Sequence, residues 1–175
     1  ATSPGKAVVT MIGAASGDTR PGGIAEIDDA TGAFTTTFGP GPLRSASDLG
    51  PKYMYDFDAL EEVNRGISTT FGPPALCGGG IAPSCLGDEV AVWDLQQRKV
   101  IQVANLGANS GALEVRFIGQ PGVRRAFVNT PGTHAVGLAE DDDKDGVFRF
   151  HQVLGPGDGL LIPADMLLSY DHKFM

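Results

Sequence analysis

The stretch DEVAVWDLQQRKVIQVANLGANSGALEVRF, residues 88–117, decides the fold class of this chain. Its first part alternates β-branched with other side chains as far as Trp93, and the polar group QQRK at 96–99 then turns the chain. A second apolar run follows at 100–103, and a third, LEVRF, comes at 113–117 after a segment rich in Gly, Asn and Ser. Short β-branched and aromatic runs that are cut at regular intervals by turn residues are typical of an antiparallel meander.

The rest of the chain repeats this pattern of short strands. Its 25 glycines and 12 prolines in 175 residues suit many short strands better than long helices, and no useful helical periodicity is present. Further strands are predicted at 7–12, 24–27, 33–38, 53–57, 67–71, 126–129, 135–139 and 147–154. Grouped in fours, these strands form units of about 40–50 residues, the period expected of propeller blades.

We therefore predict an all-β chain that folds as an incomplete β-propeller of about three blades of antiparallel meander strands. Residues 1–175 would form a single partial propeller domain. Its predicted parts are blades at approximately 7–38, 53–105 and 113–154, followed by the start of a further blade at 164–175.

Composition excludes two classes of partner. The formal net charge is −8 and no cluster of Lys and Arg exists, whereas phosphate-backbone binding needs several cations on one face, so no nucleic acid is expected. No apolar run approaches the roughly 18 residues of a membrane span, so no transmembrane segment is expected.

Two features leave alternatives open. The chain begins at Ala1 with no visible signal peptide, which fits either a removed targeting peptide, and so an organelle, or a trimmed chain. Cys77 and Cys85 share a loop rich in Gly and Pro, where a disulfide and two free thiols are both reasonable. The CxxC spacing typical of zinc and thioredoxin-like sites is absent.

A set of short phrases resembles the selenium-binding protein family, which includes the methanethiol oxidases. The phrases, in order, are GGIAEID at 22–28, YDF at 55–57, Asn64 with IST at 67–69, VWD at 92–94, LEVRF at 113–117 and DMLLS at 165–169. The resemblance runs over nearly the whole chain but matches only the middle third of a family member. It implies a propeller of seven or eight blades, with the cytoplasm as the usual compartment.

The resemblance also implies a copper site held by histidines, one of them in the family phrase RHNVMISTEW. The corresponding stretch here is EVNRGISTTF at 62–71, so Val63 stands at the histidine position. Thr70 and Phe71 replace the glutamate and tryptophan that follow it in the family phrase. Copper needs convergent imidazole, thiolate or thioether ligands, and valine offers none. Copper is therefore not expected on these residues.

Asp141, Asp143, Asp145 and Gly146 spell DxDxDG, the beginning of a calcium loop. Oxygen ligands at alternate positions and a glycine at the sixth suit a hard cation. The twelfth position, where a bidentate glutamate is usual, is Gln152, and strands rather than helices are predicted around the motif. Calcium bound by the three aspartates and an acidic hairpin turn without metal both stay open, and the acidic turn is favoured.

The remaining polar residues have structural interpretations. His134, His151 and His172 are the only histidines and are too far apart in sequence to suggest one metal site. Glu114 and Arg116 fall on one strand face, where an ion pair within the propeller is more usual than a substrate contact. Trp93 is predicted to be a core anchor between blades. No catalytic residue is assigned.

Two functions of different class stay open, and the first is favoured. The chain is either a non-catalytic scaffold, docked as an accessory or structural subunit in a larger protein assembly through its open blade edges, or a fragment of a copper-dependent methanethiol oxidase-like enzyme whose histidines lie elsewhere. An incomplete propeller leaves apolar blade faces and strand edges uncovered, which favours a partner. A calcium-binding β-protein is the third interpretation.

Overall fold

The computed structural model describes residues 5–13, 21–38, 54–71 and 86–167. Within these ranges the chain consists of antiparallel strands, short 3₁₀ turns and connections, with no α-helix. None of the described residues forms a helix long and apolar enough to cross a bilayer. Cys77, Cys85 and His172 lie outside the described residues.

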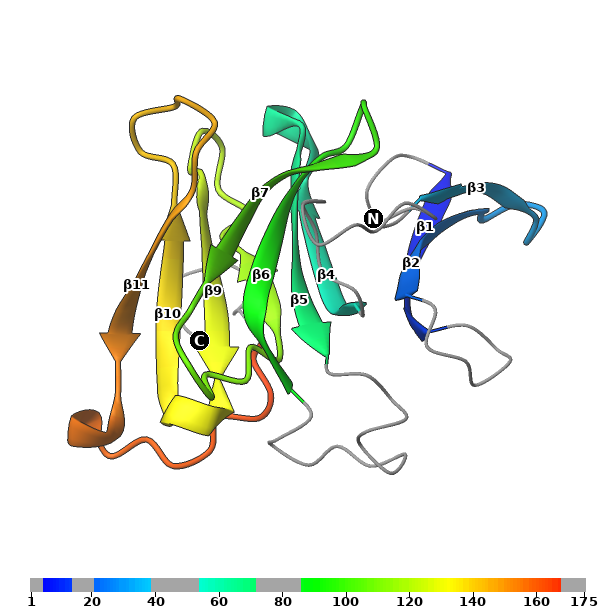
Figure 1. Cartoon of the computed structure of the whole chain (residues 1–175). Helices are drawn as coiled ribbons and strands as arrows, with labels where there is room; N and C mark the ends of the chain where they lie inside the picture. Colours follow the sequence, from blue (N-terminus) through cyan, green and yellow to red (C-terminus); the bar gives the residue numbers. More distant parts are fainter. Residues whose placement is uncertain (1–4, 14–20, 39–53, 72–85, 168–175) are drawn as a thin grey trace.

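The strands form three separate sheets (Figure 1). The first contains β1 (Lys6–Gly13), β2 (Pro21–Asp28) and β3 (Phe34–Phe38). The second contains β4 (Met54–Leu60), β5 (Arg65–Phe71), β6 (Leu86–Asp94) and β7 (Lys99–Asn105). The third contains β8 (Val115–Phe117), β9 (Arg125–Thr130), β10 (Ala135–Glu140) and β11 (Arg149–Leu154).

Each sheet is a meander in which consecutive strands are neighbours, so each has its first strand at one edge. These first strands, β1, β4 and β8, also adjoin one another, because β4 contacts both β1 and β8. Three meanders that stand side by side with their first strands together form consecutive blades of an incomplete β-propeller (Figure 1). We call β1, β4 and β8 the inner strands. The predicted fold class is confirmed.

The core lies between the blades. Side chains of the second and third blades meet in one cluster, whose buried members are Ile67, Val90, Val92, Ala112, Val115, Phe117, Ala126, Val128, Ala139 and Phe148. A second cluster joins the first and second blades through Ile24, Met54, Ala91 and Trp93. Because successive residues of a strand point to opposite faces, β6 supplies Val90 and Val92 to one cluster and Ala91 and Trp93 to the other.

Trp93 is fully buried between the first two blades, as predicted. Its indole Nε1–H donates to Ser68 Oγ at 2.8 Å, and its ring meets the Phe57 ring edge-on with centroids 6.5 Å apart. The hydrogen bond satisfies the one polar group that the indole carries into the core.

The boundary between the second and third blades falls within residues 88–117, since β7 ends the second blade and β8 begins the third. One difference from the sequence prediction lies in β11, which was predicted from Val147 and begins at Arg149. The backbone of Phe148 instead forms hydrogen bonds with the side-chain amide of Gln102 in the second blade. The Gln102 amide donates to the Phe148 carbonyl at 2.6 Å and accepts the Phe148 N–H at 2.9 Å.

The segment between β4 and β5 contains the 3₁₀ turn η1 (Glu61–Val63). Similar turns are η4 (Pro131–Thr133), between β9 and β10, and η5 (Pro156–Asp158), after β11.

Candidate functional site

Carboxylates of one blade bond to the inner strand of the next. Strand β8 pairs with β9 along one edge only, which leaves the N–H groups of Val115 and Phe117 on the other edge without a strand partner. Asp56 on β4 accepts the Val115 N–H at 2.9 Å, and Asp58 accepts the Phe117 N–H at 2.7 Å. These two side chains satisfy donors that an open strand edge would otherwise expose.

The same arrangement continues from the third blade. Glu114, which directly precedes β8, accepts the backbone N–H of Met166 at 2.9 Å. Met166 follows the last strand of that blade by many residues and is buried, with 4% of its surface exposed. We call Asp56, Asp58 and Glu114 the inner-edge acceptors, because each receives an N–H from the segment that follows its own blade.

Arg116 links the inner-edge acceptors electrostatically. Its guanidinium donates to Asp56 and lies 3.5 Å from Glu114 Oε2, so the Glu114–Arg116 pair predicted from the sequence is present and extends into the neighbouring blade. Burial raises the pKa of Asp58 above its usual range. Burial also raises the pKa of Glu114, and the nearby Asp165 carboxyl acts in the same direction.

The pKa of Arg116 is raised as well. Burial opposes this shift, but the charge of Asp56 and the hydrogen bond to it outweigh that effect. The carboxylates of this region are thus engaged with N–H donors and a guanidinium. That arrangement holds strands in place and leaves little free donor capacity for a metal ion.

The described residues do not fit the copper site that the family resemblance implies. Val63 is the last residue of η1, in the hairpin between β4 and β5, and its aliphatic side chain cannot ligate. His134 follows η4 and its Nδ1 accepts the Ile162 N–H, whereas His151 lies exposed on β11 with its Nδ1 3.6 Å from Glu140. Over the ranges that the structure describes, no three His, Cys, Asp or Glu side chains group so as to hold a metal ion.

The three aspartates of the predicted calcium loop point to arginines rather than to a common centre. Asp141 is fully buried and pairs with Arg124 at 2.9 Å. Asp143 and Asp145 both pair with Arg149, at 3.4 and 2.9 Å. The hydrogen bond from Arg149 lowers the pKa of Asp145 to about 2. Calcium stays a prediction, and binding would require these carboxylates to leave their guanidinium partners.

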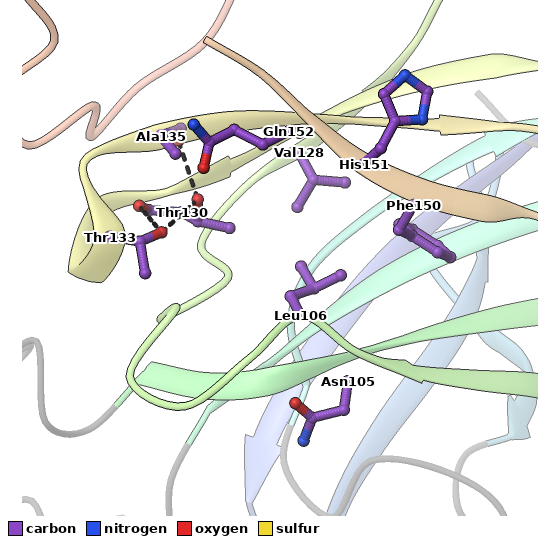
Figure 2. Close-up of a pocket in the computed structure, with 10 residues that line it drawn as sticks. Asn105, Leu106, Val128, Thr130, Thr133, Ala135, Phe150, His151 and Gln152 are labelled. Atoms are coloured by element: carbon purple, nitrogen blue, oxygen red, sulfur yellow. Dashed lines mark hydrogen bonds between the residues drawn. The ribbon is translucent and has the colours of Figure 1, made fainter. Parts of the chain in front are cut away.

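A hollow that the sequence did not predict lies between the second and third blades (Figure 2). Its volume is about 220 Å³, and its lining includes Asn105, Leu106, Val128, Thr130, Phe150 and Gln152. Its one titratable lining residue is His151, whose ring points away from the hollow in Figure 2. The Thr130 hydroxyl donates to the Ala135 carbonyl and accepts from Thr133, so it is already engaged with the protein.

Side chains alternate between the two faces along β9 and β11, so Val128 and Thr130 share one face and Phe150 and Gln152 do as well. This alternation can be seen in the sequence. The sequence does not show that the end of β7 lies opposite this face, because that follows from how the blades pack. The lining carries no Lys, Arg, Asp or Glu, so the hollow suits at most a small uncharged molecule.

Comparisons with known proteins agree with the architecture. The family model described as 56 kDa selenium binding protein (SBP56) matches residues 1–174. The methanethiol oxidase of Homo sapiens is 26% identical over 98% of this chain and 38% of its own length. Selenium-binding protein 2 of Mus musculus is 25% identical over 74% of this chain and 30% of its own length. The chain thus spans well under half the length of these relatives.

A solved structure shows the same fold at low sequence identity. The hypothetical selenium-binding protein from Sulfolobus tokodaii superposes with a TM-score of 0.69 and 22% identity, over 86% of this chain and 33% of that one. The family match over almost every residue, together with the blade architecture, assigns the chain. It belongs to the 56 kDa selenium-binding protein family.

Proposed function

We propose that this chain is a non-catalytic scaffold of the selenium-binding protein type, which acts as a structural or accessory subunit in a larger protein assembly. The observation that carries the proposal is the use of the inner-edge acceptors. Asp56 and Asp58 accept backbone N–H groups of the next blade, and Glu114 accepts the N–H of Met166 in the segment that follows the third blade. Such groups stabilise a framework and are poorly placed to act on a substrate.

The uncovered blade faces supply the contact surface for a partner. Val153 lies on β11, the edge strand of the third blade, and is 40% exposed. Phe34, at the start of β3 in the first blade, is 70% exposed. Burying such side chains is worth about 25 cal/mol for each Å² removed from water. The proposal therefore assigns both end blades to contacts with other protein.

We expect Val153→Asp to weaken the assembly, because a carboxylate would have to be buried at the contact. The measurement is the fraction of tagged protein in the high-mass peak of a native gel or size-exclusion run from the source organism. Val147→Asp is the matched control, since Val147 is 47% exposed but precedes β11 and is not part of the edge strand. Equal effects of the two substitutions, or a wild-type protein that elutes only as a monomer, would contradict the proposal.

A second function is favoured by the relatives. The Homo sapiens protein that matches 98% of this chain is named methanethiol oxidase, so the chain is alternatively part of an enzyme of that kind. In that case the copper ligands lie outside the described residues, because no three His, Cys, Asp or Glu side chains among those residues group so as to hold a metal ion. Consumption of methanethiol by the purified natural protein, with bound copper, would favour this function over the scaffold.

A further inference from the structure

The segment after η5 is attached to the third blade by few polar contacts. We call residues 159–167 the strap. The Ile162 N–H donates to Nδ1 of His134 at 3.2 Å, and the Met166 N–H donates to Glu114. The strap exposes apolar side chains next to both anchors, with Leu161 79% and Leu167 74% exposed. Its two anchoring acceptors are both titratable groups.

The strap is also held in an unusual backbone conformation. Ile162 has a φ of 51°, in the left-handed region. That region is a genuine outlier for a β-branched residue, because its Cβ crowds the backbone. A residue in such a conformation persists only when surrounding contacts hold it there. The Ile162 N–H that His134 accepts belongs to this strained residue.

Another hairpin turn of the same chain shows the role that His134 plays. Asn64 follows η1 in the left-handed region (φ 57°), as His134 follows η4 (φ 54°). The Asn64 side chain accepts the backbone N–H of Gln96 at 2.8 Å, so it too holds a later segment against the turn. The two turns use one arrangement, but the acceptor is an amide oxygen in one and an imidazole nitrogen in the other.

We propose that His134 is a pH-dependent latch for the strap. In the closed state the ring proton is on Nε2 and the lone pair of Nδ1 accepts the Ile162 N–H. A second proton, taken up at Nδ1 on acidification, occupies that lone pair and leaves two N–H groups facing each other. Loss of this acceptor on protonation would open the strap, and histidine as a residue type is the side chain that changes charge between about pH 5 and 8.

The other titratable groups near this contact are carboxylates that have partners of their own. On the strap side, Asp158 accepts the Gly155 N–H and Asp165 accepts the Met166 N–H. The connection at 107–111 accepts a backbone hydrogen bond from Gly132 of the η4 turn. Beside this connection, Asp88 accepts the N–H groups of Asn109 and Gly111. No described carboxylate forms an ion pair with His134. Glu114, at the other anchor, is therefore the competing switch that the test must separate.

The test is hydrogen–deuterium exchange of the full chain, followed in peptides that cover the strap at about pH 5.5 and about pH 8. Rates are corrected with an unstructured peptide of the same sequence. We expect protection of the strap in the wild type to fall about fivefold to tenfold at the lower pH, the scale of one lost hydrogen bond. His134→Asn keeps an acceptor and the left-handed preference, so it should protect the strap equally at both pH values.

Two further variants make the outcome decisive. His151→Asn, which removes an exposed histidine away from the strap contact, should behave as the wild type does. Glu114→Gln keeps an acceptor for Met166 but cannot ionise, and it should leave the pH dependence in place. A wild-type strap whose protection is the same at both pH values would overturn the proposal. So would a His134→Asn variant that still opens on acidification, because the switch would then be Glu114 or the fold as a whole.

Discussion

Asp58 accepts hydrogen bonds that stabilise the contact between two blades, but its burial makes its ionisation unfavourable. It accepts the N–H groups of Phe117 at 2.7 Å and Ala59 at 2.9 Å, yet burial raises its pKa above the ordinary aspartate value of 3.8. Because the pKa is higher in the folded chain than in the unfolded chain, ionisation of Asp58 opposes folding. The free energy of unfolding therefore decreases as the pH rises from the ordinary aspartate pKa through the raised pKa of Asp58 in the folded chain.

We expect Asp58→Asn to remove this part of the pH dependence, since the amide oxygen still accepts the Phe117 N–H but carries no charge. The variant should gain stability relative to the wild type as the pH rises through that window. Urea unfolding at a series of pH values measures the difference.

Asp145→Asn is a control, because the effect of Asp145 on stability changes with pH in the opposite direction. The pKa of Asp145 is lowered to about 2, so its ionised form favours folding and that contribution is lost as the pH falls from 3.8 towards 2. The wild type should lose its advantage over this variant on acidification. A stability difference between wild type and Asp58→Asn that does not change with pH would contradict the assignment.

Strand β5 is packed so closely that it requires glycine at one position. A Cβ on Gly66 would lie 2.5 Å from Cζ of Phe57 and 3.0 Å from Cδ2 of Leu95. Both neighbours belong to the core between the first two blades, where overpacking forces side chains out of their rotamers.

Gly66→Ala should therefore reduce the free energy of unfolding by about 1–3 kcal/mol. Gly157→Ala is the matched control, because nothing lies within 4 Å of its added Cβ, and its effect should stay within about 0.5 kcal/mol. Chemical denaturation of both variants measures the effects. Equal stabilities would mean that β4 and β5 are not packed as described.

The sequence predicts the strands well but not how the blades are joined. Alternation and turn residues locate most strands, because burial on one face leaves a local pattern. The Gln102 contact with Phe148 and the Asp56 contact with Val115 connect residues about 46 and 59 positions apart. Nothing local distinguishes such side chains from exposed polar residues, so the inner-edge acceptors and the inter-blade hollow could not be predicted.

Across the whole chain, family membership explains the framework of blades. The phrases YDF and LEVRF contain Asp56, Glu114 and Arg116, and Arg116 pairs with Glu114 beside it and with Asp56 of the neighbouring blade. Val63 stands where the resemblance implies a copper ligand. Residues of these two phrases thus take part in the contacts that hold neighbouring blades together.

Native mass spectrometry of the protein isolated from its source, with metal analysis and a methanethiol assay on the same sample, distinguishes the scaffold from the enzyme. The scaffold predicts this chain in a stable complex with other protein, without stoichiometric copper bound to it and without consumption of methanethiol. A polypeptide that runs free of partners, binds copper and consumes methanethiol would contradict it.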